Sequence, residues 1–362
     1  MESNNIIQTN APREKHLYLE CLRILAVFFV IFNHTGYEGF LLFTQRTPGS
    51  APFWIYLFFA VFCKFSVGLF FAISGALLLG REQESLAQLW KKRISKIFLI
   101  LLIFSIIYYV NRAFLYGETL SFREFFRMFY EGGTEGHLWY LYGHITFLIS
   151  LPFFRAMVKH LDTNFYLYMI ALSIGIYGLL PILEYLLWQG TRTLSWHITV
   201  PWLSVNTVFY PLLGYFLHHK VDIHKNRRWL PLLWTANIAG ILLSSYMTYY
   251  KGVLTGVFSS ANSQTFLGTL SAINIICIFL TVKYLFEKKS SHRWMLSLGS
   301  CTFGIYLIHV LVLKSTLSKR VLEFLLTIGM NDMIAVLLQC LAVLMLCYLM
   351  VYLFKRIRIL FT

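Results

Sequence analysis

Glu20-Cys-Leu-Arg-Ile-Leu-Ala-Val-Phe-Phe-Val-Ile-Phe-Asn-His34 is an apolar stretch that nevertheless carries an acid, an arginine and a histidine. Arg23 and His34 are eleven residues apart, so in a helix they lie within about 20° of one face and about 16 Å apart along the axis. Ionisable residues within a membrane helix are energetically unfavourable and by default mark a functional site. One helix face therefore presents a fixed cation near one membrane surface and a titratable imidazole deeper in, which suits a long anionic cofactor.

The composition places the whole chain in a membrane. Of its 362 residues 58% are hydrophobic and only 13% are charged, which is about half the charged share of a soluble domain. Long apolar windows predict an all-α, polytopic helical membrane protein with about ten transmembrane helices. The predicted spans are 17–40, 54–80, 94–115, 137–158, 164–187, 202–218, 229–250, 266–286, 295–315 and 332–354. We expect one transmembrane domain over 17–354, with short tails at 1–16 and 355–362 and no soluble catalytic domain.

The distribution of basic residues predicts which side of the membrane holds the chain ends. Twenty Lys and Arg residues fall on the side of the two termini and nine on the other, with the cluster at 314–320 as the exception. By the positive-inside rule both termini are cytoplasmic, in a plasma or inner cell membrane. The net charge of +15 is spread over short loops, so we expect anionic lipid headgroups and an anionic cofactor as partners, and no nucleic acid.

Short motifs in the predicted spans point to one family. Five pieces occur in order: Glu20-x-x-Arg23-x-Leu-Ala26 with His34, Phe70-Phe71-Ala-Ile-Ser74-Gly75, Lys92-Arg93-Ile-Ser-Lys96, His137-Leu-Trp139-Tyr140-Leu with Pro152, and Gly304-Ile-Tyr306-Leu-Ile-His309. Together they resemble the acyltransferase 3 family, membrane enzymes that O-acylate cell-surface glycans and related hydroxylated acceptors. The acid before the arginine is commonly Asp in that family and is Glu20 here. The paired arginines of the third span appear as Arg93 and Lys96, and lysine lacks the planar fork of arginine.

His34, Arg23 and Glu20 are the predicted catalytic residues. A neutral imidazole, with an unperturbed pKa of about 6.5, takes the proton of an acceptor hydroxyl as the hydroxyl attacks a thioester. The structural alternative for His34 is a buried histidine bound to a backbone carbonyl. Arg23, paired with Glu20 three residues earlier, is expected to shape the mouth of a cofactor tunnel; the alternative is an arginine that snorkels to lipid phosphate.

The remaining site predictions depend more on the resemblance. It implies that Arg93 and Lys96, with Arg23, bind the phosphates of the cofactor, although positive-inside anchoring also explains this basic cluster. Five residues are predicted to bind the acceptor or complete the polar interior: His137, Trp139, Tyr142, Tyr306 and His309. Interfacial anchoring of the aromatic residues and interhelical hydrogen bonding of the last two are the alternatives. Lys64 either snorkels outward or faces the same cavity as His34.

No metal site is predicted. His218, His219, Asp222 and His224 lie among basic neighbours, which oppose a bound cation, so a solvated loop is the preferred interpretation. Ser74-Gly75 lacks the spacing of a hydrolase nucleophile and predicts small-residue helix packing instead.

The sequence as a whole predicts a membrane O-acyltransferase. It is expected to move an acetyl group from cytoplasmic acetyl-CoA to a hydroxyl of an envelope or exported glycan. The alternative is a secondary transporter or flippase for an anionic or glycan-linked substrate, although no pair of Gly/Pro-broken spans recurs in the two halves. A non-catalytic scaffold would leave the burial of Arg23 and His34 unexplained. Release of free thiol from acetyl-CoA distinguishes the enzyme from the transporter.

Overall fold

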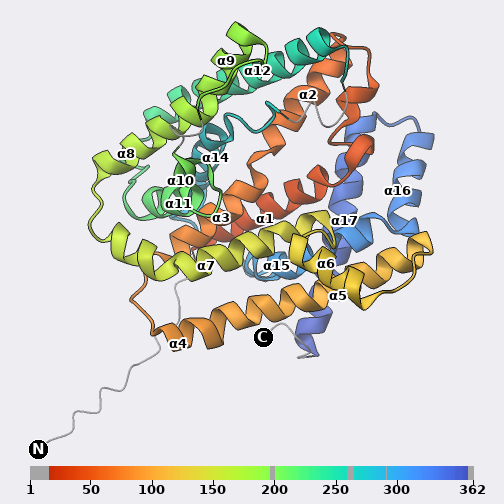
Figure 1. Ribbon diagram of the computed structural model, residues 1–362, viewed down its shortest axis with the longest axis horizontal. Helices are drawn as coiled ribbons and strands as arrows, with labels where there is room; N and C mark the ends of the chain where they lie inside the picture. The colour runs from red at the N-terminus through yellow and green to blue at the C-terminus, as the bar shows by residue number, and fades with distance from the viewer. Residues whose placement is uncertain (1–15, 196–199, 259–264, 291, 358–362) are drawn as a thin grey trace, which may run out of the picture.

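The computed structural model describes residues 16–195, 200–258, 265–290 and 292–357, and these residues form helices and no strand (Figure 1). Residues 1–15 and 358–362 of the two predicted tails lie outside the described residues. The α-helices are α1 (Leu17–Asn33), α2 (Ala51–Cys63), α3 (Phe65–Leu78), α4 (Leu86–Leu89), α5 (Ser95–Tyr116), α6 (Phe122–Glu131), α7 (Trp139–Val158), α8 (Thr163–Leu172), α9 (Leu180–Trp188), α10 (Pro201–Ser204), α11 (Phe209–His219), α12 (Trp229–Thr255), α14 (Ser271–Phe286), α15 (Arg293–Leu313), α16 (Thr316–Thr327) and α17 (Asp332–Arg356).

The all-α, polytopic prediction is confirmed, and each predicted span contains a helix. Seven helical segments of the described chain are long and apolar enough to cross a membrane. Three other predicted spans hold shorter helices: α1 has 17 residues, α11 has 11 and α14 has 16. Eleven residues extend about 16 Å, which is about half the hydrocarbon thickness. The helix of the predicted span 202–218 is therefore much shorter than a membrane-crossing helix.

Several boundaries differ from the prediction. The span predicted at 17–40 ends as a helix at Asn33, because the Thr35 hydroxyl donates to the Phe32 carbonyl at 2.7 Å and accepts from the Phe40 amide at 2.9 Å. This pair of bonds turns the chain into a short 3₁₀ segment. The span predicted at 54–80 is two helices, α2 and α3, which meet at Lys64. Two helices with one apolar face, α6 and α16, occupy segments that were predicted as loops.

Helix α1 lies in the middle of the bundle (Figure 1). It packs against α3, α14, α15 and α17, and none of its residues is exposed. Its polar side chains therefore face other helices and the spaces between them. Arg23 is half-buried among protein groups and has Glu20 as an ion-pair partner, which lowers the energetic penalty of a charge inside the membrane, whereas His34, just after the end of the helix, is exposed.

Helices α3 and α11 cross in direct backbone contact. A Cβ atom on Gly75 would overlap the carbonyl oxygen of Pro211, and one on Gly214 would overlap the carbonyl oxygen of Ala72. Only glycine permits this approach at both points, and small residues at helix contacts are typical of membrane bundles. The prediction of small-residue packing at Ser74-Gly75 is confirmed.

A buried lysine terminates α11. The Lys283 ammonium, on α14, donates to the carbonyls of Leu217, His218 and Val221 at 3.0, 2.9 and 2.8 Å. The residue is only 3% exposed and lies within α14, so it acts as a cap for the neighbouring helix. Its three donors satisfy carbonyls that the end of a helix leaves free.

Candidate functional site

The Arg23 end of α1 opens into a cavity of about 360 Å³. The guanidinium of Arg23 donates to Glu20 Oε1 at 2.5 Å, in an ion pair within one turn of the helix. The cavity is lined by Arg23, Phe70, Ile73, Ser74, Leu77, Ile97, Tyr140, His144, Gly299, Ser300, Thr302, Phe303 and Tyr306. Arginine has five N–H donors, so the pair with one carboxylate oxygen leaves donors that an anion in this cavity can use.

Arg93 and Lys96 lie outside this cavity. Arg93 Nε donates to Glu84 Oε1 at 2.7 Å, and the buried Arg155 donates to the same oxygen at 3.1 Å. Arg155 also donates to the Leu78 carbonyl at 3.0 Å. Arg93 is thus one of two cations on a single carboxylate at the end of α3, and Lys96 is exposed on α5. The structure brings Arg23 and Glu20 together and places Arg93 in a separate ion-pair network.

The His34 end of α1 opens into a second, larger cavity of about 660 Å³. Hydroxyl, amide and aromatic groups dominate its wall. The lining residues that carry polar side chains are Asn33, His34, Lys64, Trp139, Ser173, Tyr177, Ser204, Asn206, Tyr210, Thr269 and Ser271. Two of them, Tyr210 on α11 and Ser271 on α14, are hydrogen-bonded to each other at 3.0 Å. This composition suits an acceptor that is rich in hydroxyl groups.

The hydrogen bonds of His34 indicate which of its ring nitrogens carries a proton. Nδ1 lies 2.7 Å from the carbonyl oxygen of Val30, and a carbonyl only accepts, so Nδ1 carries the proton. His309 Nδ1 lies 2.6 Å from the Tyr306 carbonyl and carries a proton for the same reason. His309 Nε2 is then an acceptor, and it lies 3.3 Å from His34 Nδ1. When both rings are neutral, Nε2 of His34 is unprotonated, which is the state that a general base requires.

Two further histidines, His137 and His309, lie beside this base. The ring centroid of His137 lies 5.9 Å from that of His34 and 5.0 Å from that of His309. His137 is 1% exposed, and neither of its ring nitrogens has a hydrogen bond of normal geometry within the described residues. Its backbone carbonyl accepts from the Tyr306 hydroxyl. The predicted residues His137, Tyr306 and His309 are therefore brought together with His34, around the point where α1, α7 and α15 approach each other.

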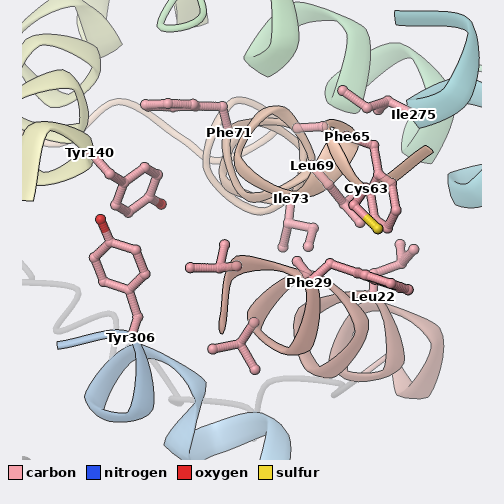
Figure 2. Packing of buried hydrophobic residues seen from close by; sticks show 14 of the residues in the cluster. Leu22, Phe29, Cys63, Phe65, Leu69, Phe71, Ile73, Tyr140, Ile275 and Tyr306 are labelled. Carbon is pink, nitrogen blue, oxygen red and sulfur yellow. The ribbon is translucent and has the colours of Figure 1, made fainter. Parts of the chain in front are cut away.

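Aromatic side chains stand between the two cavities. Figure 2 shows the rings of Tyr140 and Tyr306 beside α3, and their centroids are 5.2 Å apart. Both line the Arg23 cavity, and the Tyr306 hydroxyl reaches toward the histidine cluster on the other side. Helix α3 lines both cavities, through Phe70 on one side and Val67 on the other. Tyr306 therefore contacts both the Arg23 cavity and the histidine cluster.

The other two predicted acceptor residues are placed differently. Trp139 lines the His34 cavity, with 41% of its surface exposed. The Tyr142 hydroxyl donates to the Phe129 carbonyl of α6 at 2.6 Å and lines neither cavity. Tyr142 therefore attaches α6 to the bundle.

Sequence reasoning did not include several residues of the two cavities among the candidates. Lys64, for which the sequence left outward snorkelling and this cavity as alternatives, stands in the wall of the His34 cavity. Tyr210 and Ser271 belong to helices far apart in the sequence, and nothing in their local sequence marks them. His144 lines the Arg23 cavity, and its Nδ1 is buried without a hydrogen bond to any described residue.

Comparison with known proteins agrees with this geometry. Within the part of the chain that the structure describes, no three His, Cys, Asp or Glu side chains are arranged to hold a metal ion. Searches of curated proteins and of solved structures give no match. The model of the acyltransferase 3 family, described as an acyltransferase domain, matches residues 16–352. Because this match covers nearly the whole helical bundle, the chain belongs to the acyltransferase 3 family and is a membrane acyltransferase.

Proposed function

We propose that this acyltransferase takes an acetyl group from acetyl-CoA and transfers it to a hydroxyl of an envelope or exported glycan. The observation that carries the proposal is the pair of cavities at the two ends of α1, one beside Arg23 and the other beside the unprotonated Nε2 of His34. The acyl donor and the hydroxyl acceptor would occupy different cavities and meet at the histidine cluster.

Arg23 is the proposed main contact of the CoA phosphates. Its guanidinium keeps donors free in the cavity, and charge-assisted bonds to phosphate are stronger than neutral ones. Arg93 and Lys96 would add contacts outside the cavity, where Arg93 already has Glu84 as a partner. The separation of about 16 Å between Arg23 and His34 along α1 suits a carrier with its charge at one end and its thioester at the other.

His34 is the proposed general base of the transfer. The acceptor oxygen forms a bond to the thioester carbonyl carbon while its proton moves to His34 Nε2, and the carbon–sulfur bond then breaks. The proton returns from His34 to the leaving sulfur and gives the free thiol. Nδ1–H keeps its bonds to the Val30 carbonyl and to His309 Nε2, so both acceptors stabilise the imidazolium that forms.

We further propose that the Arg23 end faces the cytoplasm and that the protein resides in a plasma or inner cell membrane. The excess of Lys and Arg on that side supports this orientation. Lys355 near the end of α17 donates to the Ser300 carbonyl at 2.6 Å, and Ser300 lines the Arg23 cavity. The first and last helices of the described chain therefore reach the same end of the bundle, as termini on one side require.

The decisive experiment is acetyl transfer by the purified His34→Ala variant. Loss of a general base removes a factor of about 10² to 10⁴ in turnover, measured as thiol release from acetyl-CoA together with label transfer to glycan. His160→Ala, at an exposed position after α7, is the matched control and should keep wild-type turnover. Wild-type turnover in folded His34→Ala would refute the assignment, and an absence of thiol release in the wild type would favour a transporter.

A further inference from the structure

Lys64 is a cation in the wall of the His34 cavity that has no carboxylate partner among the described residues. It stands at the junction of α2 and α3 and is half-buried. Its ammonium lies 4.7 Å from the ring centroid of Phe40, and no ion pair or hydrogen bond of its side chain occurs within the described residues. A cation over an aromatic ring gains some stabilisation, but less than a carboxylate would provide.

Other buried cations of the bundle are satisfied. Arg23 has Glu20 at 2.5 Å, Arg155 has Glu84 at 3.1 Å, and Lys283 has three carbonyls within 3.0 Å. Removal of a charge from water is unfavourable unless a partner compensates for it, and this fold supplies such partners repeatedly. The absence of one at Lys64 is therefore informative about what the cavity holds when it is occupied.

The rest of the cavity wall cannot supply the missing negative charge. Among the described residues that line the cavity, Lys64 is the one with a fixed formal charge, and no Asp or Glu is present. Asn33, next to the base, donates to the Ser66 hydroxyl at 2.9 Å, while its Oδ1 is buried without a hydrogen bond. The wall thus offers a cation for an anionic group and a carbonyl oxygen for a hydroxyl donor.

We infer that the acceptor bound beside His34 is an anionic sugar, with a carboxylate or phosphate on Lys64 and a hydroxyl directed to His34 Nε2. This inference rests on the proposed function, because it describes the acceptor of the same transfer. Asn33 Oδ1 accepts a hydrogen bond from a second hydroxyl of the sugar. Lys64 is a specificity-determining residue in this arrangement, since it binds a group that does not react.

The inference is tested by binding to the full-length protein in nanodiscs of neutral phosphatidylcholine. Methyl glucuronide and a methyl glucoside phosphate are compared with neutral methyl glucoside, which has the same ring. The wild type should bind at least one anionic sugar about tenfold to hundredfold more tightly than the neutral one. Lys64→Met should abolish this preference, whereas Lys64→Arg should retain it.

Matched variants and a second readout separate the outcomes. Lys251→Met removes a cation that donates to Thr265 outside the cavity, and it should keep the preference. Equal binding of the three sugars by the wild type would overturn the inference even if Lys64→Met did not fold. A preference that persists in Lys64→Met would also overturn it and leave Lys64 as an interfacial lysine. If the wild type prefers the anionic sugars but releases no thiol from acetyl-CoA, the proposed acetyl transfer is refuted, whereas the inferred anion site is supported.

Discussion

The cations at the two ends of α1 differ in whether a carboxylate of the protein lies beside them. At the Arg23 end the guanidinium has a carboxylate one turn away, and Arg93 and Arg155 nearby share Glu84. At the His34 end Lys64 has no carboxylate among the described cavity residues. The cations at the first end are balanced by carboxylates of the protein itself, whereas the anionic acceptor that we propose would supply the balancing charge at the second. Under the proposals above, Arg23 binds the phosphates of the acyl donor at one end and Lys64 binds the anionic group of the acceptor at the other.

The largest expected effect comes from the helix crossing that supports both ends. Gly75→Ala would press a methyl group into the Pro211 carbonyl, and backbone cannot move aside as a side chain can. We expect a loss of about 3 kcal/mol in stability, which exceeds the gain of about 1 kcal/mol from alanine in a helix. Thermal unfolding in detergent measures it. Gly175→Ala, where a Cβ atom meets open space, is the control, and equal melting temperatures of the two variants would contradict the crossing.

A second prediction sharpens the description of the His34 end. His309→Leu removes one of the two acceptors of the His34 Nδ1 proton and leaves the Val30 carbonyl, so the ring is less well oriented. We expect kcat to fall about 10²-fold with little change in the KM of acetyl-CoA, since small misplacements of a catalytic group have effects of this size. His309→Gln keeps an acceptor oxygen near the same position and should recover part of kcat. A Leu variant as active as the Gln variant would show that His309 does not position His34.

The smallest predicted effects are on acetyl-CoA binding, in variants of two cations at the Arg23 end. Arg23→Gln should weaken acetyl-CoA binding by about 1.5–3 kcal/mol, the value of a charge-assisted contact. Arg93→Gln should weaken it by less than about 1 kcal/mol, because Arg93 lies outside the cavity and is already paired. Calorimetric titration of each variant with acetyl-CoA measures both. A larger loss of acetyl-CoA affinity in Arg93→Gln than in Arg23→Gln would show that Arg23 is not the main phosphate contact.

Much of the fold could be predicted because it depends on local sequence. Apolar windows locate the helices of the predicted spans, and the Glu20–Arg23 pair follows from a spacing of three residues on one helix. The same reasoning could have found α6, where Phe122, Phe125 and Phe129 recur at helical spacing between charged residues. Because this segment is short and carries many charges, it is not one of the long apolar windows from which the spans are predicted.

The site could be predicted only in part, because its contacts join distant segments. His34 and His309 were each selected, but their hydrogen bond links residues 275 positions apart. No local pattern states that Arg93 faces Glu84 or that Tyr142 reaches the Phe129 carbonyl. The direction of Lys64 was left open for the same reason, since helix periodicity fixes a face only when the neighbouring helices are known. The proposed roles of the site residues remain predictions.

The local ion pair of α1 also bears on how the protein is made. Helix α1 is synthesised before α15, which covers its polar face and begins only at Arg293. At about 5–20 residues per second the intervening chain takes on the order of 10–50 s to appear. During that interval α1 has to exist in the membrane or the insertion machinery without α15. Because Glu20 and Arg23 neutralise each other within one turn, the nascent helix carries its own counterion until α15 arrives.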